Sequence, residues 1–337
     1  MKAITFSDIL IEPQYSEVLS RSSVDTSSRI GKMTVDVPVA SANMRNITGP
    51  KMAREMRRNG AYGILHRFNS VEDAVVEYKQ AGRLSGVSIG VKDGDRKRFD
   101  KLYEAGARVF CIDVAHGHHV LVKNMLKWIG GGLGKDRKRV TVIAGNVATY
   151  EGTCDLACWG ANVVKVGIGS GSCCETRRKA GVGVPQIHAL MRSAAARRKE
   201  TLDIQIMSDG GIVYMGDIPK ALIWAESVMI GSLFAATSET PGRVFRNDDG
   251  EFYKVYGGSA SGENKLASGG DGQFVEGVMK TVSFKGHVKH VVREIKESIQ
   301  MAFAYVGANN LDEFRCKVRW NEIDVGGHME SKYMGRR

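Results

Sequence analysis

Eight short apolar runs recur through the first 230 residues of the chain, and helical patterns separate them. The runs are mostly continuous in apolar residues, which is typical of strands buried on both faces of a parallel sheet. Eight such strands alternating with helices predict an α/β fold, a (β/α)8 or TIM barrel. The expected strands are 35–41, 61–65, 87–91, 109–114, 140–144, 163–167, 204–208 and 226–230.

Helical patterns fill the intervals, and each begins near a proline or a residue able to cap a helix. Pro50 and Pro185 suit a first helical turn, and Ser70 and Thr149 suit the capping position. The expected helices are 50–59, 71–80, 94–106, 118–128, 150–160, 185–199 and 216–225. An open, doubly wound sheet is the alternative. No G-x-G-x-x-G turn follows the first predicted strand, which disfavours it.

Two regions stand outside this repeat. Residues 1–34 form an N-terminal extension, and residues 287–315 read as one or two amphipathic helices. Residues 243–286 are rich in glycine, serine and charge, and a segment this long without periodicity is usually functional or mobile. Since it follows the eighth predicted strand, we expect a mobile flap over the carboxyl-terminal mouth, where barrel enzymes do chemistry. The expectation is one barrel domain over residues 1–337.

The composition is that of a soluble globular enzyme, with 43% hydrophobic and 25% charged residues. No apolar run approaches the roughly 20 residues that a membrane helix needs. Asp8 and Glu12 interrupt the short apolar stretch near the N-terminus, so no signal-peptide core is expected. These features predict a cytoplasmic protein without a membrane partner.

The balance of charge is basic, because 48 Lys and Arg residues against 37 Asp and Glu residues give +11. Such a balance fits either a nucleic acid or a phosphorylated substrate. The basic residues are spread along the chain, and no zinc-finger or RNA-recognition signature accompanies them. We therefore expect mostly solvated helix faces and no nucleic-acid partner.

The cysteines point to reduced thiols, because a long chain without an export signal rarely carries a disulfide framework. Cys154 and Cys158 lie four apart on a predicted helix, where packing is expected. Cys173 and Cys174 follow the glycine-rich stretch 167–171. A thiol there, near Arg177, can have a depressed pKa and act as a nucleophile. A buried thiol beside a basic loop is the alternative.

Glycine turns follow the last two predicted strands. One is Ser208-Asp209-Gly210-Gly211, and the other is Gly231-Ser232. In barrels, these two loops commonly hold a phosphate through backbone N–H groups. Asp209 beside such a site can accept hydrogen bonds from ribose hydroxyls. The alternative is that the glycines only permit tight turns.

Two further groups of polar residues are candidates. Asp113 ends the predicted strand 109–114, and three histidines follow it by residue 119. A metal site is conceivable there, but adjacent histidines diverge on a helix, so an acid that contacts a ligand is the better interpretation. Glu276 lies in the predicted flap, where a carboxylate can serve as acid or base once closure desolvates it. A plain surface acid is the alternative.

Taken together, these residues resemble the IMP dehydrogenase/GMP reductase family over nearly the whole chain. The motifs are FSDILIEP at 6–13, SANM at 41–44, DVAHG at 113–117, AGNVAT at 144–149, VKVGIGSGSCCETR at 164–177, GVGVPQ at 181–186, SDGG at 208–211 and VMIGSLFA at 228–235. The reductase branch is favoured. Residues 66–86 leave no room for the regulatory domains inserted in the dehydrogenases, and residues 256–259 (YGGS) look like a reductase loop.

The resemblance implies NADPH-dependent reductive deamination of GMP to IMP and ammonia. Cys174 would attack C2, and Thr176 and Glu276 would relay protons. A homotetramer is implied, as is a potassium ion on the backbone carbonyls of Gly169, Gly171 and Cys174. The implied substrate contacts are Ser172, Asp209, Gly211, Gly231, Ser232, Tyr256, Gly258, Ser259 and Gln273. The implied cofactor contacts are Asp113, Asn146, Arg67 and, toward a neighbouring subunit's cofactor, Tyr305.

The chain departs from the family pattern at several positions. Glu175 follows the nucleophile, and an acid there tends to raise the thiol pKa unless its side chain turns away. Ser170 replaces a usual proline, and Arg45 and Arg67 replace residues common in reductases. Gln273 stands in place of a reductase arginine and is closer to a dehydrogenase choice.

These departures keep other functions open. One is NAD-dependent oxidation of IMP to XMP, supported by Gln273 and by GVGVPQ at 181–186. A divergent family member acting on a related purine nucleotide is another. A third is a non-enzymatic nucleotide- or nucleic-acid-binding protein, suggested by Glu175 and by the net charge of +11.

Overall fold

The computed structural model describes residues 2–257 and 279–330, and it contains a closed barrel of eight parallel strands. Neighbouring strands follow the chain order, and the last strand pairs with the first to close the barrel. The strands are β4 (Val39–Ser41), β5 (Tyr62–Leu65), β6 (Gly86–Ile89), β7 (Val109–Asp113), β8 (Thr141–Val147), β9 (Val163–Val166), β10 (Gln205–Asp209) and β11 (Ser227–Ile230). The predicted TIM barrel is confirmed, and each predicted run overlaps one of these strands.

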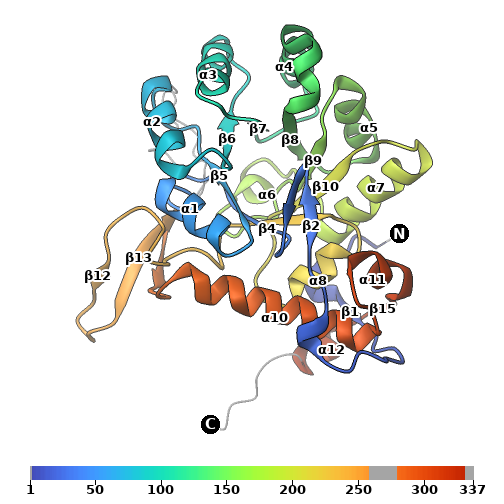
Figure 1. Cartoon of the computed structure of the whole chain (residues 1–337). Coiled ribbons are helices and arrows are strands. Elements are labelled where there is room, and N and C mark those ends of the chain that lie inside the picture. The colour runs from blue at the N-terminus through green and yellow to red at the C-terminus, as the bar shows by residue number, and fades with distance from the viewer. Residues whose placement is uncertain (1, 258–278, 331–337) are drawn as a thin grey trace.

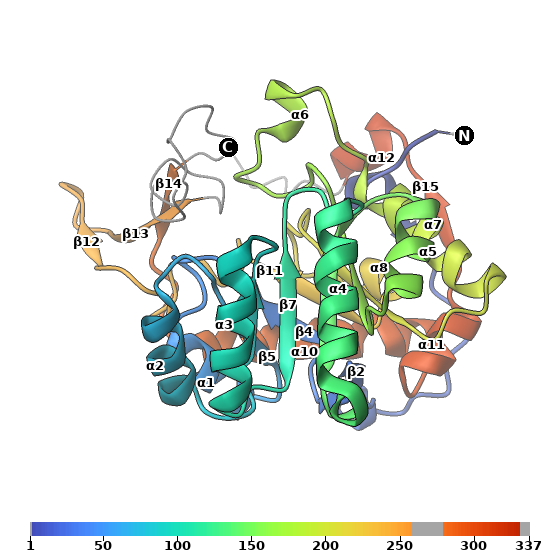
Figure 2. The same cartoon turned by 90° about the horizontal axis from the view of Figure 1, so that it is seen from above.

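Helices surround the barrel as a ring (Figures 1 and 2). They are α1 (Pro50–Arg58), α2 (Val71–Ala81), α3 (Asp93–Glu104), α4 (Val120–Leu133), α5 (Tyr150–Trp159), α7 (Gln186–Lys199), α8 (Asp217–Leu222) and α10 (Val288–Val306). The start signals act as expected: Pro50 opens α1, and the side chains of Ser70 and Thr149 accept hydrogen bonds from the first turns of α2 and α5. The predicted helices are confirmed. α10 packs against both α1 and α8 and completes the ring.

The first predicted strand is wrong in one respect, because residues 35–41 are not continuous. The structure divides them between β3 (Met33–Val35) and β4. Pro38 lies between them and has no N–H to donate to a ladder. Its carbonyl instead accepts a hydrogen bond from Val228 of β11. β3 pairs with β2 (Ser28–Ile30) as a separate hairpin.

Smaller elements complete the described chain. In the N-terminal extension, β1 (Ile9–Ile11) pairs antiparallel with β15 (Trp320–Glu322). This pairing joins the N-terminal extension to the C-terminal part of the chain. The remaining helices are α6 (Thr176–Lys179), α11 (Leu311–Lys317), α12 (Val325–Glu330) and the 3-10 turns η1 (Phe6–Asp8), η2 (Arg21–Ser23) and η3 (Gly134–Arg139). α10 and α11 confirm the expected helices in 287–315.

The region expected to be a flap contains a three-stranded antiparallel sheet. Its strands are β12 (Phe245–Arg246), β13 (Phe252–Gly257) and β14 (Met279–Ser283). In Figure 2, β13, β14 and α6 lie on the side toward which the β7 arrow points, which is the carboxyl-terminal mouth. Lys280 and Lys285 donate to the carbonyls of Ser172 and Ser232, in the loops after β9 and β11. The sheet therefore borders the mouth, and its mobility stays a prediction.

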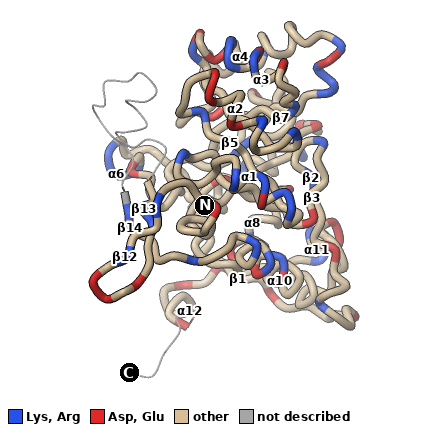
Figure 3. Tube along the Cα trace, turned by 60° about the vertical axis from the view of Figure 1, so that its left-hand side comes forward, with Lys and Arg blue, Asp and Glu red and all other residues tan. Residues whose placement is uncertain are grey.

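Two global expectations bear on the surface. No helix in residues 2–257 or 279–330 is both long and apolar enough to cross a membrane. Figure 3 shows lysines and arginines on elements all around the barrel, with acidic residues among them. The excess of positive charge is thus spread over the described surface, as the sequence predicts.

Candidate active site

Cys174 lies in the loop between β9 and α6, at the carboxyl-terminal mouth. Its side chain is exposed, and its Sγ atom lies 3.0 Å from Oγ1 of Thr176. The N–H of Cys174 donates to the carbonyl of Gly171 at 3.0 Å, which fixes the turn that presents the thiol. A hydroxyl this close can donate a hydrogen bond to a thiolate and stabilise it. The described geometry therefore suits a nucleophile rather than a packed thiol.

The neighbouring Cys173 has the opposite environment. It is buried at 3% exposure, and burial raises the pKa of its thiol. Its Sγ atom lies 3.9 Å from the hydroxyl of Ser172. The adjacent cysteines are thus separated by exposure: Cys173 packs into the core, and Cys174 faces the mouth.

Glu175 does not oppose a thiolate in the way its sequence position suggested. Its carboxylate lies 2.9 Å from Nζ of Lys179 and 3.8 Å from a guanidinium nitrogen of Arg178. The hydrogen bond from Lys179 lowers the pKa of Glu175. Arg178 and Lys179 follow Glu175 by three and four residues. Side chains at this spacing lie next to each other on a helix. Its negative charge is thereby paired.

The glycine turns after β10 and β11 meet the loop that carries the cysteines. The hydroxyl of Ser170 donates to the carbonyl of Asp209 at 3.1 Å, which joins the loops after β9 and β10. Ser232 donates to the carbonyl of Ile212 at 2.9 Å, which joins the turns after β10 and β11. Gly211 lies in the first of these turns, directly after β10. The predicted phosphate turns are therefore adjacent in space.

Tyr256 of β13 extends into this group of loops. Its ring is buried, and burial raises the pKa of its hydroxyl. A Cβ placed on Gly231 would lie 2.7 Å from that hydroxyl, so only glycine lets Tyr256 approach the turn after β11. Ser172 is a hydrogen-bond partner of the same hydroxyl. The structure thus brings together Ser172, Gly231 and Tyr256, which the sequence placed far apart.

A buried lysine lies beneath the mouth. Lys165 of β9 is 1% exposed, and its Nζ atom lies 2.9 Å from Asp113 of β7 and 2.6 Å from Asp209 of β10. Burial lowers the pKa of Lys165, but the two carboxylates outweigh burial and raise it. Burial raises the pKa of Asp113, but Lys165 and Arg67 outweigh burial and lower it. Lys165 and Asp113 therefore favour their charged forms in the fold.

Asn146 connects this ion triad to the loop above it. Its side-chain amide donates to Asp209 at 2.9 Å and to the carbonyl of Gly167 at 2.7 Å. Its Oδ1 atom is buried and has no hydrogen-bond partner among the described residues. Buried acceptors are normally satisfied, so an unpaired one at the edge of a site suits a donor on a ligand.

Arg67 belongs to the same cluster, and Tyr305 does not. Nε of Arg67 donates to the carbonyl of Asp113 at 3.1 Å. Tyr305 lies on α10, and 62% of its surface is exposed. Its contact with a neighbouring subunit's cofactor stays a prediction. The expected residues Gly258, Ser259, Gln273 and Glu276 lie outside the described residues.

Lys165 was missed in the sequence analysis. The available signal was a single charge within a run that otherwise predicts a fully buried strand, VVKV. A lysine is almost never fully buried unless it is paired, so its position alone indicates nearby carboxylates. Which carboxylates they are depends on strand neighbours that the sequence does not specify.

The histidines after β7 have structural contacts. His118 lies 2.7 Å from the carboxylate of Asp155 on α5, and the ring of His119 accepts a hydrogen bond at the start of α4. Among the described residues, no three His, Cys, Asp or Glu side chains are grouped as a metal site would require. His118 thus contacts α5, and His119 caps α4.

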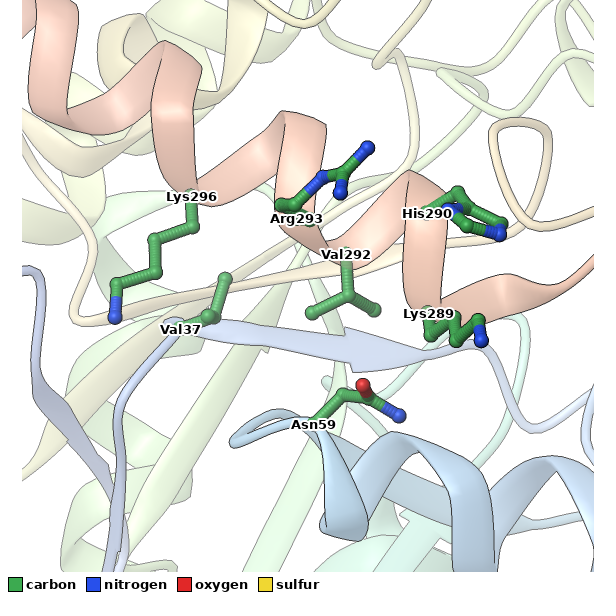
Figure 4. Close-up of a pocket in the computed structure, with 7 residues that line it drawn as sticks. All are labelled: Val37, Asn59, Lys289, His290, Val292, Arg293 and Lys296. Carbon is green, nitrogen blue, oxygen red and sulfur yellow. The ribbon is translucent and has the colours of Figure 1, made fainter.

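A separate hollow of about 410 Å³ lies near the amino ends of the strands, remote from Cys174 (Figure 4). Its lining combines basic and apolar side chains and includes no acidic residue. The lining residues are Val37, Asn59, Lys289, His290, Val292, Arg293 and Lys296. None of the predicted site residues lines it.

Comparison with known proteins agrees with this geometry. The family model described as IMP dehydrogenase / GMP reductase domain matches residues 3–333. The chain belongs to this family. The motif resemblance is thereby confirmed.

The family's curated relatives include a GMP reductase of Acidovorax sp. (strain JS42), 35% identical over 99% of this chain and 99% of its own length. A GMP reductase of Ligilactobacillus salivarius (strain UCC118) is 38% identical over 92% of this chain and 94% of its own. Among solved structures, a cysteine-to-alanine variant of GMP reductase from Trypanosoma brucei, in complex with guanosine 5'-monophosphate, is similar with a TM-score of 0.90. That structure is 26% identical and covers 99% of this chain and 98% of its own.

Proposed function

We propose that the protein is a GMP reductase, which converts GMP to IMP and ammonia with NADPH as the reductant. The observation that carries this proposal is the exposed Sγ of Cys174 lying 3.0 Å from Thr176 at the barrel mouth. The curated relatives named GMP reductase match nearly the full length, and a similar structure was solved with guanosine 5'-monophosphate. The resemblance at the residue level then supplies the roles below.

The substrate's sugar and phosphate would lie against the turns after β9, β10 and β11. Backbone N–H groups of Gly211, Gly231 and Ser232 are suited to a phosphate, and the Ser172 and Tyr256 hydroxyls lie beside them. Asp209 is fixed by Lys165 and Asn146, so its carboxylate is oriented to accept from ribose hydroxyls. By family resemblance, Gly258, Ser259 and Gln273 would contact the same nucleotide and its purine edge.

The reaction divides into substitution and reduction. The Cys174 thiolate adds to C2 of the purine, and the 2-amino group takes a proton and leaves as ammonia, which gives a thioimidate. After hydride reaches C2, the C–S bond breaks and returns the thiolate with IMP. Thr176 stabilises the thiolate at 3.0 Å, and Glu276 is the family's acid for the departing amine. A covalent intermediate replaces one difficult step by two easier ones.

The residues expected to hold the cofactor fit that group. NADPH, when bound, supplies the hydride. Asp113 and Arg67 are held together at the end of β7, and the unpaired Oδ1 of Asn146 is an acceptor suited to a carboxamide N–H. The proposal thus places the nicotinamide near Asp113 and Asn146.

A potassium ion fits the same loop. Carbonyl oxygens are hard ligands that replace the hydration shell of K⁺. The Gly171 carbonyl accepts only the N–H of Cys174 among the backbone hydrogen bonds of the described loop, which leaves its second lone pair for a cation. Gly169 and Cys174 would supply further carbonyls. The bound ion would keep the cysteine loop in order.

We further propose that the protein forms a homotetramer and is cytoplasmic. Tyr15, Leu19 and Tyr305 are strongly exposed, at 86%, 102% and 62%, and the Gln14 N–H donates to the carbonyl of Tyr305. These apolar side chains lie on adjoining segments of one surface. Burial of exposed aromatic groups is typical of subunit interfaces.

Activity with purified protein tests the proposal. GMP and NADPH together should consume the near-ultraviolet absorbance of NADPH and release one ammonia per NADPH oxidised, and Cys174→Ala should stop both. Absence of turnover by the wild type with a nucleotide-by-cofactor panel would overturn it.

The same panel separates the family's other reaction. Gln273 and the GVGVPQ segment favour NAD-dependent oxidation of IMP to XMP. Appearance of NADH with IMP, and no reaction with GMP, would assign the protein to that branch.

A further inference from the structure

Lys165 lies in one layer of the barrel with Asp113. The strand register pairs Asp113 of β7 with Gly145 of β8, and Gly145 with Lys165 of β9. A Cβ on Gly145 would lie 2.5 Å from the Lys165 carbonyl oxygen and 2.7 Å from its Cβ. The absence of a side chain on β8 therefore gives Lys165 room to reach across a whole strand to Asp113.

The same amine also reaches Asp209, on the other side of β9. The side chain of Lys165 is only 2% exposed, and those of Asp113 and Asp209 are 17% and 20% exposed. One buried cation thus lies between two carboxylates from different strands. Three other titratable groups face this triad. They are Cys111 on β7, Arg67 after β5 and Tyr256 on β13.

Removing the cation would leave two close carboxylates in a largely buried site. Like charges that close cannot both ionise, and the pair then shares a proton. A carboxyl group that carries a proton is a poorer acceptor for a sugar hydroxyl. The charge on Lys165 thus affects how well Asp113 and Asp209 can each accept a hydrogen bond from a ligand.

We propose that Lys165 is a positioning residue that joins the substrate subsite to the cofactor subsite. Its amine holds the carboxylates of Asp209 and Asp113 in place as oriented acceptors for the hydroxyl groups of two different bound nucleotides. This inference rests on the proposed function, which assigns Asp209 to the ribose of the purine nucleotide and Asp113 to the nicotinamide end of the cofactor.

The test is the pH dependence of KM and of calorimetric GMP binding for Lys165→Met between pH 6 and 9. The variant should bind GMP about tenfold more weakly at pH 6 than at pH 9, because at low pH its two carboxylates share a proton. A change of one pKa unit corresponds to a tenfold change in binding. The KM for NADPH should change in the same direction. The wild-type values should vary less than about threefold over this range, because Lys165 keeps both carboxylates ionised.

Two further variants make the result specific. In Lys165→Met/Asp113→Asn the surplus charge is gone, so the pH dependence of GMP binding should fall to about the wild-type level while the KM for NADPH stays raised. Lys254→Met is the matched control, because Lys254 is also buried but donates to neutral oxygens of Thr240. Its pH profile should run parallel to that of the wild type.

The outcomes separate the two proposals. If wild-type protein turns over GMP and Lys165→Met shifts binding by one constant factor at every pH, Lys165 is merely structural and the inference fails alone. If Lys165→Met does not fold, Lys165→Met/Asp113→Asn serves as the test. GMP binding by that double variant that depends on pH more steeply than in the wild type would also overturn the inference. Lack of any wild-type turnover overturns the proposed function instead.

Discussion

The Sγ atom of Cys174 and the Oγ1 atom of Thr176 lie 3.0 Å apart, across the start of α6. Because Glu175, the residue between them, turns toward Lys179, the hydroxyl rather than the carboxylate faces the thiol. The hydroxyl of Thr176 can donate a hydrogen bond to the sulfur, and the carboxylate of Glu175 is paired with Lys179 instead. This arrangement suits Cys174 to act as a nucleophile.

Thr176→Val should lower kcat for GMP reduction by about 10²-fold, in the range that a positioned proton-transfer group contributes. The change keeps the side-chain shape and removes the hydroxyl that lies beside Cys174. Steady-state kinetics measures kcat, and calorimetry should show GMP affinity within about threefold of wild type. Thr176→Ser is the matched control and should keep most of the activity. Equal kcat for the Val and wild-type proteins would remove Thr176 from the mechanism.

Glu175→Gln should change kcat less than about threefold, because the charge of Glu175 is already paired with Lys179 and Arg178 on α6 and exposed ion pairs contribute little. Kinetics at pH 7 and the rate of iodoacetamide alkylation of Cys174 measure the effect. Peptide mapping should find the label on Cys174 and not on buried Cys173. A gain in activity of tenfold or more would show that Glu175 does oppose the thiolate.

The contact of Tyr256 with the turn after β11 is testable by an added methyl group. Gly231→Ala places a Cβ 2.7 Å from the Tyr256 hydroxyl. Overpacking of this kind costs roughly 1–3 kcal/mol, so the KM for GMP should rise about tenfold or more. In the double variant with Tyr256→Phe, the space of the lost hydroxyl accepts the methyl group, so the KM should rise by less than the product of the factors for Gly231→Ala and Tyr256→Phe alone. Strictly additive effects in this cycle would show that the two residues do not interact.

Much of the fold could be predicted from the sequence, because strands buried on both faces require continuous apolar runs and the helices carry their own start signals. Features that depend on neighbours distant in the chain could not be predicted in the same way. Pro38 divides the first run, since the hydrogen bond of its carbonyl to β11 replaces continuation of β3. The pairing of β13 with β14 joins two segments that residues 258–278 separate in the chain.

The candidate site was predictable to a similar depth. Cys174, Asp209 and the two glycine turns carry motifs whose chemistry can be read locally. Lys165 could be identified as unusual, but its partners follow from the order of β7, β8, β9 and β10 around the barrel. The direction of Glu175 depends on a choice among side-chain contacts that α6 permits and the sequence does not decide.

His66, which directly follows β5, should make the stability of the fold depend on pH. His66 is buried, and burial, together with Arg45 and Arg98, lowers its pKa to about 4. In the unfolded chain its pKa is near the ordinary value of about 6.5, so acid protonates the unfolded chain first and stabilises it. The stability that His66 contributes is therefore present above pH 6.5 and is lost as the pH falls toward 4. The expected loss is about 2 kcal/mol between pH 7 and pH 4.5.

Denaturant unfolding at several pH values measures this loss, and His66→Asn is the comparison. Asn cannot titrate, and its carbonyl can take over the hydrogen bond that the ring accepts from the N–H of Phe68. Burial raises the pKa of Glu77, which faces His66 at 3.8 Å and changes stability in the opposite sense. Because Glu77 is present in both proteins, the difference between them isolates His66. Wild-type and His66→Asn stabilities that fall in parallel with acid would show that His66 is not held neutral in the fold.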